Sequence, residues 1–291
     1  TDDPQFVGDV MRFLDNVLQD FIDNAPDNMS KAKYAAMRER SVGLGAMGLH
    51  SYLQQKRVPL ESAMAKSLNM RIFKHIKVLA DRASREMAVE IGPCPDAADF
   101  GVMERFSNKL AIAPTASISI ICGGTSPGIE PFAANSYVHK TLSGSFNVRN
   151  KHLTKLLQEK GRDDDKIWSS IVANEGSVQH LDCLTQNEKD VFKTAFEIDQ
   201  RWLIELAADR VPFICQSQSL NLFLPADIHK RDLHGIHFSA WKKGLKSLYY
   251  CRSKSLQRAD TIASLGAGAA AVAQREPQTL DSRIDYDECL A

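Results

Sequence analysis

The residue types best suited to chemistry in this chain lie in the stretch APTASI, residues 113–118. A proline, two hydroxyl side chains and small residues stand there directly before an apolar run. Such a loop leaves backbone N–H groups free at a helix start, where the helix dipole also favours negative charge. The pattern indicates a phosphate-binding loop or, more commonly for an isolated hexapeptide, an ordinary helix cap at Thr115 or Ser117. The candidate phosphate-binding residues are Pro114, Thr115, Ala116, Ser117 and Ile118.

Two adjacent tyrosines, Tyr249 and Tyr250, form a second candidate, at the end of a short strand expected over residues 246–251. Paired tyrosines most often serve as core or interface residues. Because successive side chains of a strand point to opposite faces, the two phenols could act together only where the backbone bends. Stacked by such a bend, they could relay an electron and a proton over a distance that one phenol cannot cover.

Two further side chains are candidates for chemistry. Glu130 lies in the turn-rich segment 123–131, whose composition keeps the backbone flexible; it either acts on a substrate or is a solvated loop carboxylate. Cys289 lies near the end of a polar segment that we expect to be flexible. An accessible thiol there suits thiol–disulfide exchange, and an incidental surface thiol is the alternative.

Composition excludes several classes of function. The chain has 291 residues, 44% of them hydrophobic, which is enough for one large domain or two small ones. Acidic and basic residues balance at 36 each, so we expect no direct nucleic-acid partner, although a small anionic ligand is compatible with this charge. The longest run of small apolar residues, 262–273, is too short to span a bilayer, so we expect no membrane partner.

Six cysteines are scattered along the chain without a C-x-x-C pair or a zinc-ligand spacing, so we assign no metal site. Scattered cysteines without a signal peptide indicate free thiols, and we expect a cytoplasmic protein, in the host cytoplasm if a phage encodes it. The cysteines are Cys94, Cys122, Cys183, Cys215, Cys251 and Cys289.

Helices should form most of the first third of the chain. A second helix is expected over residues 60–91, ended by Gly92 and Pro93. Between the first two helices, three glycines in residues 41–48 fit neither a G-x-G-x-x-G fingerprint nor a P-loop, and they predict close backbone packing. The apolar stripe that predicts the first helix consists of Val10, Phe13, Leu14, Val17, Leu18 and Phe21.

The second half alternates helices and strands, which indicates an α/β fold with parallel strands. A capping box of Thr185 and Glu188 opens this part. After residue 251 apolar patterning is lost, so residues 252–291 are expected to form a flexible tail. The expected elements are a helix over 191–210, a strand over 213–224, a short helix capped by Asp227, a helix through Trp241 and a strand over 246–251.

Six short segments, in matching order and spacing over residues 5–251, resemble the large catalytic subunit of an aerobic (class Ia) ribonucleotide reductase. The residues of these segments are most similar to those of the viral and eukaryote-like branch of the family, which includes T4-like phages. The segments are 40–45, 113–117, 128–131, 142–146, 216–221 and 248–250.

This resemblance implies reduction of ribonucleoside diphosphates to deoxyribonucleoside diphosphates, with residues 114–118 around the substrate diphosphate. It implies that a radical arrives from a small subunit with an iron–tyrosyl radical, through Tyr250 as outer relay and Tyr249 as inner relay. A thiyl radical then removes the 3′ hydrogen of the ribose, the 2′ hydroxyl leaves as water, and a dithiol supplies the electrons. Tail cysteines, here Cys289, reduce the disulfide again, with thioredoxin or glutaredoxin as reductant. No cofactor is expected in this chain.

The departures from the family restrict what this chain can supply. The family carries its radical cysteine in an N-x-C-x-E loop, which none of the six cysteines matches, and its disulfide-forming cysteines also lie upstream. The resemblance therefore implies the C-terminal half of the α/β barrel over residues 1–251, with a helical N-terminal segment, and a redox tail over 252–291. The family has a pair of cysteines in its tail, whereas this chain has Cys289 alone near the end. We expect a split subunit that acts with a separate chain carrying the N-terminal half.

A non-catalytic protein of the same fold, which binds a nucleotide or the small subunit without turnover, is the alternative. The presence of both the phosphate loop and the tyrosine pair favours chemistry, because a scaffold needs neither. A glycyl-radical enzyme is disfavoured because no R-V-x-G-Y-like segment stands near the terminus.

Overall fold

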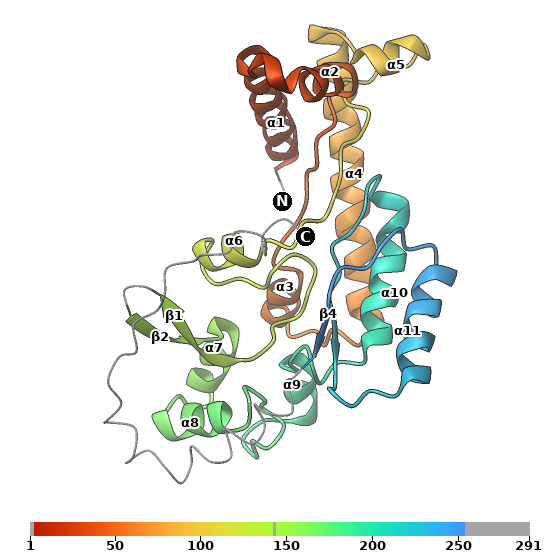
Figure 1. The fold of residues 1–291 in the computed structure, drawn as a ribbon. Helices are drawn as coiled ribbons and strands as arrows, with labels where there is room; N and C mark the ends of the chain where they lie inside the picture. The colour runs from red at the N-terminus through yellow and green to blue at the C-terminus, as the bar shows by residue number, and fades with distance from the viewer. Residues whose placement is uncertain (1–2, 142–143, 254–291) are drawn as a thin grey trace, which may run out of the picture. The chain divides into compact units, whose positions relative to one another are not determined.

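The computed structural model describes residues 3–141 and 144–253 (Figure 1). Its α-helices are α1 (Pro4–Asn24), α2 (Ser30–Glu39), α3 (Leu49–Gln55), α4 (Ala63–Ile91), α5 (Pro95–Asp99), α6 (Ala116–Ile121), α7 (Lys151–Glu159), α8 (Asp165–Ala173), α9 (Gln186–Val191), α10 (Gln200–Arg210) and α11 (Lys230–Lys242). Two 3-10 turns are η1 (Asp27–Met29) and η2 (Val211–Phe213). The strands are β1 (Ser136–Thr141), β2 (Gly144–Arg149), β3 (Leu222–Leu224) and β4 (Cys251–Ser253). Among the described residues, no helix combines the length and apolar character needed to cross a membrane.

Four extended segments run in parallel and form the framework of the fold: 42–45, 109–112, 216–224 and 249–253. Isolated parallel bridges join the first three segments, at Leu44 with Leu110 and at Ile112 with Gln218. The last two segments pair through β3 and β4, in parallel register from Leu222 and Cys251 onward. Helices connect each segment to the next, as parallel pairing requires. The predicted α/β order with parallel strands is confirmed.

Close packing of this parallel ladder depends on Gly45. A Cβ atom at that position would lie 2.5 Å from the carbonyl oxygen of Ala111, on the neighbouring segment. Real Cβ atoms do not approach a backbone oxygen so closely, so only glycine fits there. The prediction that the glycines of 41–48 serve close backbone packing is confirmed at this position.

The long helix α4 shares the main hydrophobic core with the ladder. Ser62 caps its start by accepting from the Ala65 N–H, and the chain leaves the helix at Gly92, which has φ +91°. Phe73 and Ala80, on its buried face, belong to the main hydrophobic core. The prediction of a helix over 60–91 that Gly92 ends is confirmed within a few residues, because both signals are local.

Helix α1 packs against α4, and the predicted stripe is confirmed in part: its residues Leu14 and Leu18 pack against the main core. Phe13 and Val17 are 64% and 53% exposed, whereas Met11 is fully buried. Asp15 lies on the same buried face, where its carboxylate pairs with Arg40 (Nε–Oδ1, 2.9 Å) and with Arg105. Apolar residues occupy more than half of this helix circumference, so spacing alone could not show which edge faces the core.

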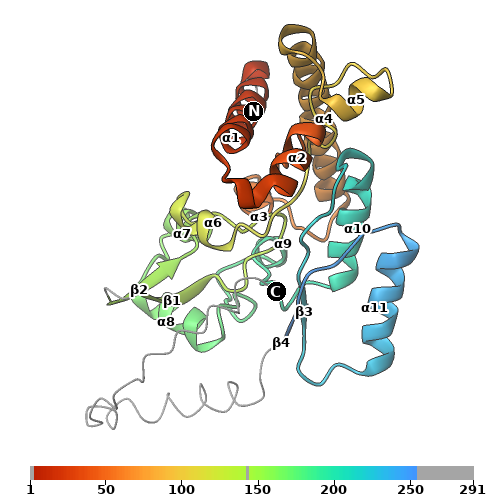
Figure 2. The same ribbon diagram turned by 45° about the horizontal axis from the view of Figure 1, so that its top comes forward.

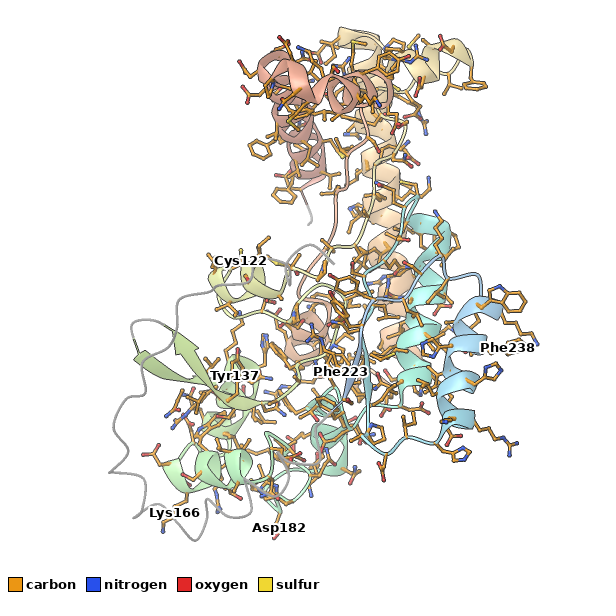
Figure 3. The ribbon with its side chains drawn as sticks, in the orientation of Figure 1. Cys122, Tyr137, Lys166, Asp182, Phe223 and Phe238 are labelled. Atoms are coloured by element: carbon orange, nitrogen blue, oxygen red, sulfur yellow. The ribbon has the colours of Figure 1, made fainter. Side chains whose placement is uncertain are left out.

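Helices α10 and α11 lie side by side on one flank of β3 and β4 (Figures 1 and 2). Phe223 of β3 is buried in the main core and meets Phe196 edge-on, with ring centroids 5.4 Å apart. Phe238 lies on the outer side of α11, away from the strands, and is 49% exposed (Figure 3).

A second, smaller core lies beyond the parallel ladder. There α7, α8 and α9 pack around Leu153, Trp168 and Phe192. The neighbouring hairpin of β1 and β2 is antiparallel, with Ser136 opposite Arg149. The sequence interpretation did not include this hairpin.

Three predicted elements of the second half are corrected. The helix over 191–210 is interrupted after α9, because the Asp199 carboxylate accepts from the Arg201 N–H and starts a new helix, α10. Only Leu222–Leu224 of the strand over 213–224 is a regular strand, and η2 opens that segment. The strand expected over 246–251 begins instead at Cys251 and includes Arg252 and Ser253.

The caps of the second half are also partly corrected. The Thr185–Glu188 capping box is confirmed, with both reciprocal hydrogen bonds present. The predicted cap at Asp227 is wrong, because the His229 side chain accepts from the Arg231 N–H at the start of α11. The tail predicted over 252–291 lies outside the described residues from residue 254 onward.

Candidate functional site

The candidate phosphate loop follows the carboxyl end of the second parallel segment. Ile112 ends that segment, and Pro114 to Ile118 then lead into α6. The N–H groups of Ala116, Ser117 and Ile118 form the first turn of α6, where no residue of the helix itself can accept from them. All three residues are exposed, so these donors are open to an anion.

Thr115 stands at the N-cap position of α6, but its side chain makes no capping hydrogen bond. Its hydroxyl instead accepts from the Gly128 N–H at 2.8 Å. Thr115 has φ +51°, in the left-handed region that a β-branched residue rarely adopts. Thr115 therefore occupies the N-cap position, but its hydroxyl does not cap the helix as an ordinary cap residue would.

The two tyrosines open the fourth segment of the parallel ladder, immediately before β4. Their ring centroids are 4.2 Å apart with the planes 53° from each other, so both phenols lie on one side of the chain. A joint role of the two rings requires this closeness. A side-chain hydrogen bond to Tyr250 raises the pKa of Tyr249, and partial burial raises it further. Tyr249 and Tyr250 are 45% and 42% exposed, so neither is a core residue.

Glu130 is buried, and the prediction of a solvated loop carboxylate is wrong. It is 4% exposed, and its two oxygens accept from the backbone N–H (2.9 Å) and the side-chain amide (3.1 Å) of Asn221. Burial raises the pKa of Glu130, while the Asn221 donors and the charge of Arg252 oppose that rise.

Asn221 was not among the predicted site residues. Its side-chain oxygen accepts from the Tyr250 N–H at 3.0 Å, so one amide contacts both Glu130 and the tyrosine pair. A signal was present in the sequence: Asn221 is a polar residue between Leu220 and Leu222, at a position where the strand pattern is otherwise apolar.

A thiol and an imidazole lie in contact next to the tyrosine pair, and the sequence did not indicate that these two residues meet. Cys251 Sγ is 3.8 Å from His237 Nε2, and both residues are exposed. The other ring nitrogen of His237 lies 2.9 Å from the carbonyl oxygen of Leu233, to which it can only donate. That contact leaves Nε2 free to accept the thiol proton.

Residues of α3 hold the loop that carries Glu130 through hydrogen bonds. Ser51 and Ser126 exchange two hydrogen bonds between backbone N–H and side-chain hydroxyl groups, at 3.1 and 2.8 Å. The Phe132 N–H donates to His50 Nδ1 at 3.0 Å. These contacts hold the turn-rich segment at Ser126 and directly after its end at Phe132, whereas the sequence had indicated a flexible backbone.

The remaining predicted site residue, Cys289, lies outside the described residues. Among the residues that the structure describes, no group of three or more His, Cys, Asp or Glu side chains could hold a metal ion. The structure thus places the phosphate loop and the tyrosine pair on two segments that both pair with the segment 216–224.

Comparisons with known proteins identify the family. The family Ribonucleotide reductase, barrel domain, matches residues 3–100 and 99–251. The ribonucleoside-diphosphate reductase large subunit of Invertebrate iridescent virus 6 is 48% identical over 90% of this chain and 28% of its own length. That of Invertebrate iridescent virus 3 is 49% identical over 89% of this chain and 41% of its own.

A solved structure agrees with this assignment. The class Id ribonucleotide reductase alpha subunit of Actinobacillus ureae superposes with a TM-score of 0.81 at 40% identity, covering 87% of this chain and 47% of that one. The chain thus spans less than half the length of these relatives. The family and fold class expected from the sequence are confirmed: this chain belongs to the ribonucleotide reductase barrel-domain family.

Proposed function

We propose that this chain takes part in reducing ribonucleoside diphosphates to deoxyribonucleoside diphosphates, as the C-terminal part of a reductase barrel. One observation carries the proposal: the 114–118 loop directly follows the second parallel segment, Tyr249 and Tyr250 open the fourth, and the segment 216–224 between them pairs with both. Ligands of α/β proteins bind beyond the carboxyl ends of the parallel strands, and the loop follows such an end. Membership of the reductase family supports the same conclusion.

The loop would bind the substrate diphosphate through backbone groups. The first-turn N–H groups of α6 point away from the helix body, and the exposed Ser117 hydroxyl adds a further donor. The Thr115 hydroxyl takes no part, because it already accepts from Gly128. Its role is to hold the loop in the strained backbone conformation that presents these donors.

The tyrosine pair would move one electron and one proton at a time. As the radical passes inward, Tyr250 first gives up its phenolic hydrogen, and Tyr249 then restores Tyr250 by giving up its own. A thiol next in line restores Tyr249, so the electron and the proton travel outward in each step. The short ring separation and the hydrogen bond between the two phenols suit such transfers.

The complete reaction requires partners. We propose that the N-terminal half of the large subunit supplies the radical cysteine, and that a small subunit with an iron–tyrosyl radical starts the radical transfer. A thioredoxin- or glutaredoxin-like protein would provide the electrons through Cys289. No described residue of this chain would hold a cofactor in this scheme.

Replacement of each tyrosine by phenylalanine tests the proposal. The chain is combined with the N-terminal half, the small subunit and a reductant, and deoxyribonucleoside diphosphate formation is measured. Tyr249→Phe and Tyr250→Phe should each abolish nearly all activity while substrate binding, measured by calorimetry, is retained. Tyr34→Phe, which removes an exposed phenol on α2, is the matched control and should keep full activity.

Two results would contradict the proposal. Full activity in either relay variant would exclude a radical role for that phenol. Nucleoside diphosphate binding without turnover by the wild-type complex would instead favour the non-catalytic binding protein.

A further inference from the structure

A short path of hydrogen bonds joins the phosphate loop to the tyrosine pair. At one end the Gly128 N–H donates to the Thr115 hydroxyl. At the other end Glu130 binds Asn221, and Asn221 binds the backbone of Tyr250. We call the contacts of Glu130, Asn221 and Tyr250 the Glu130 link.

At the Glu130 end of the link, hydrogen bonds fix the position and orientation of the carboxylate. Its two carboxylate oxygens accept from two different donors of the same residue, which fixes the orientation of the carboxylate as well as its distance. Glu130 and Asn221 are 4% and 3% exposed, so water cannot replace either contact. A buried polar group that loses its partner is strongly penalised.

The Asn221 end is equally defined. Because its amide NH2 donates to Glu130, its side-chain oxygen must face the Tyr250 N–H. Rotating the amide by half a turn would oppose donor to donor at Tyr250 and acceptor to acceptor at Glu130. The Leu222 N–H also donates to the Tyr250 carbonyl oxygen, so both backbone groups of Tyr250 are held.

The loop end of the path is stiff. Gly128 has φ +46°, and a Cβ atom there would lie 3.0 Å from the carbonyl oxygen of Ala113, at the start of the loop. Only Ile129, 2% exposed, separates Gly128 from Glu130. A displacement of the loop at Thr115 is therefore transmitted to Glu130 over two residues of buried chain.

We propose that Glu130 and Asn221 are positioning residues that hold the tyrosine pair in register with the substrate-diphosphate loop. The proposal rests on the proposed function for the roles of the loop and the phenols. Neither residue touches the substrate; each acts through the backbone of Tyr250. A diphosphate bound to the loop stabilises the link, and an intact link keeps the phenols in the geometry needed for transfer.

A double-mutant cycle that exchanges the two functional groups tests this inference. In Glu130→Gln the new amide NH2 faces the NH2 of Asn221, so two donors meet. In Asn221→Asp the new carboxylate faces that of Glu130, so two acceptors meet. In the double variant Glu130→Gln with Asn221→Asp, the new amide donates to the new carboxylate. The second carboxylate oxygen can still accept from the Tyr250 N–H, so the double variant restores the original pattern of contacts.

The first measurement is steady-state activity in the complete reductase. Each single variant should lower kcat by about ten- to a hundredfold, because small displacements of reacting groups have effects of that size. The dissociation constant of cytidine diphosphate, the probe substrate, should change less than about threefold, since the loop donors are untouched. The double variant should recover most of the kcat. Thermal unfolding checks that each variant is folded.

The second measurement does not depend on catalysis. Hydrogen exchange of the Tyr250 amide, followed by mass spectrometry of the peptide containing it, should be slow in wild type. It should be slower still with cytidine diphosphate, fast in both single variants, and slow again in the double variant. Glu197→Gln is the matched control, because Glu197 is a partly buried carboxylate whose partners are the Thr194 N–H and the Ser177 hydroxyl and not a residue of the Glu130 link.

The outcomes separate the two proposals. Single variants with wild-type kcat and slow exchange would overturn the positioning role, as would a double variant that remains as impaired as the single ones. An inactive wild-type complex that still shows the predicted exchange pattern would overturn the proposed function and support the positioning role.

Discussion

Acidification should destabilise this chain through His50, a buried histidine of α3. His50 is 1% exposed, and its Nδ1 accepts the Phe132 N–H, so the ring must be neutral to make this contact. The pKa of His50 is lowered from its ordinary 6.5 to about 3, chiefly by burial and also by the charge of His152, while a contact with the Val191 backbone opposes the change.

The sign of the effect follows from proton binding in the two states. In the unfolded chain His50 takes up a proton near pH 6.5, whereas in the folded chain it stays neutral down to about pH 3. The unfolded state therefore binds more protons between these values, and stability is lost as the pH falls through this window. Each pH unit inside the window corresponds to about 1.4 kcal/mol. Lowering the pH from 7 to 5 should cost about 2 kcal/mol of unfolding free energy from this residue.

Urea denaturation of wild type and His50→Gln at pH 7, 6 and 5 measures this contribution. Wild type should lose about 2 kcal/mol more than His50→Gln between pH 7 and 5. The pKa of His152 is also lowered, mainly by burial, but its contribution persists in the variant and cancels in the comparison. His75→Gln, which removes an exposed histidine, should leave the wild-type pH dependence unchanged. Equal pH dependence in wild type and His50→Gln would refute the reasoning.

Two further predictions concern the ladder and the thiol beside the tyrosines. Gly45→Ala should lower the unfolding free energy by about 1–3 kcal/mol, because the new Cβ would lie 2.5 Å from the Ala111 carbonyl oxygen and force two strands apart; an unchanged urea midpoint would contradict this. Iodoacetamide should alkylate Cys251 at pH 7 about threefold or more faster in wild type than in His237→Gln, because the imidazole Nε2 lies 3.8 Å from the thiol sulfur as a hydrogen-bond acceptor. Cys122, exposed at the end of α6, is the internal control (Figure 3), and equal Cys251 rates in both proteins would exclude activation by the histidine.

Local signals predicted the helical framework well. The glycine at residue 92 and the capping box at Thr185 specify backbone conformations within a few residues, and both lie where the sequence indicated. The interruption before α10 was missed because Asp199 combines two roles: its side chain caps the new helix, while its N–H donates to Glu61, far away in sequence. Long-range contacts of this kind leave no periodic pattern in the sequence.

In the site, too, local features were predictable from the sequence and long-range contacts were not. The loop around Thr115 and the tyrosines at 249–250 are contiguous, so composition and resemblance could identify them. Glu130 and Asn221 are 91 residues apart, and each taken alone is unremarkable in sequence. Only the tertiary fold brings the loop of Glu130 to the segment of Asn221, so the sequence left a solvated carboxylate open as an alternative.

The surroundings of the phosphate loop indicate how an N-terminal half would complete the site. Ile118 and Ile121 of α6 are 54% and 83% exposed, directly beside the N–H donors proposed to bind a diphosphate. Hydrogen bonds and charge interactions with an anion are much weaker in water than in a site from which water is excluded. Covering these isoleucines would bury apolar surface, which favours association, and would also lower the local dielectric around the bound phosphate. Association and tight substrate binding should therefore be coupled, so this chain alone should bind a nucleoside diphosphate more weakly than the complete barrel does.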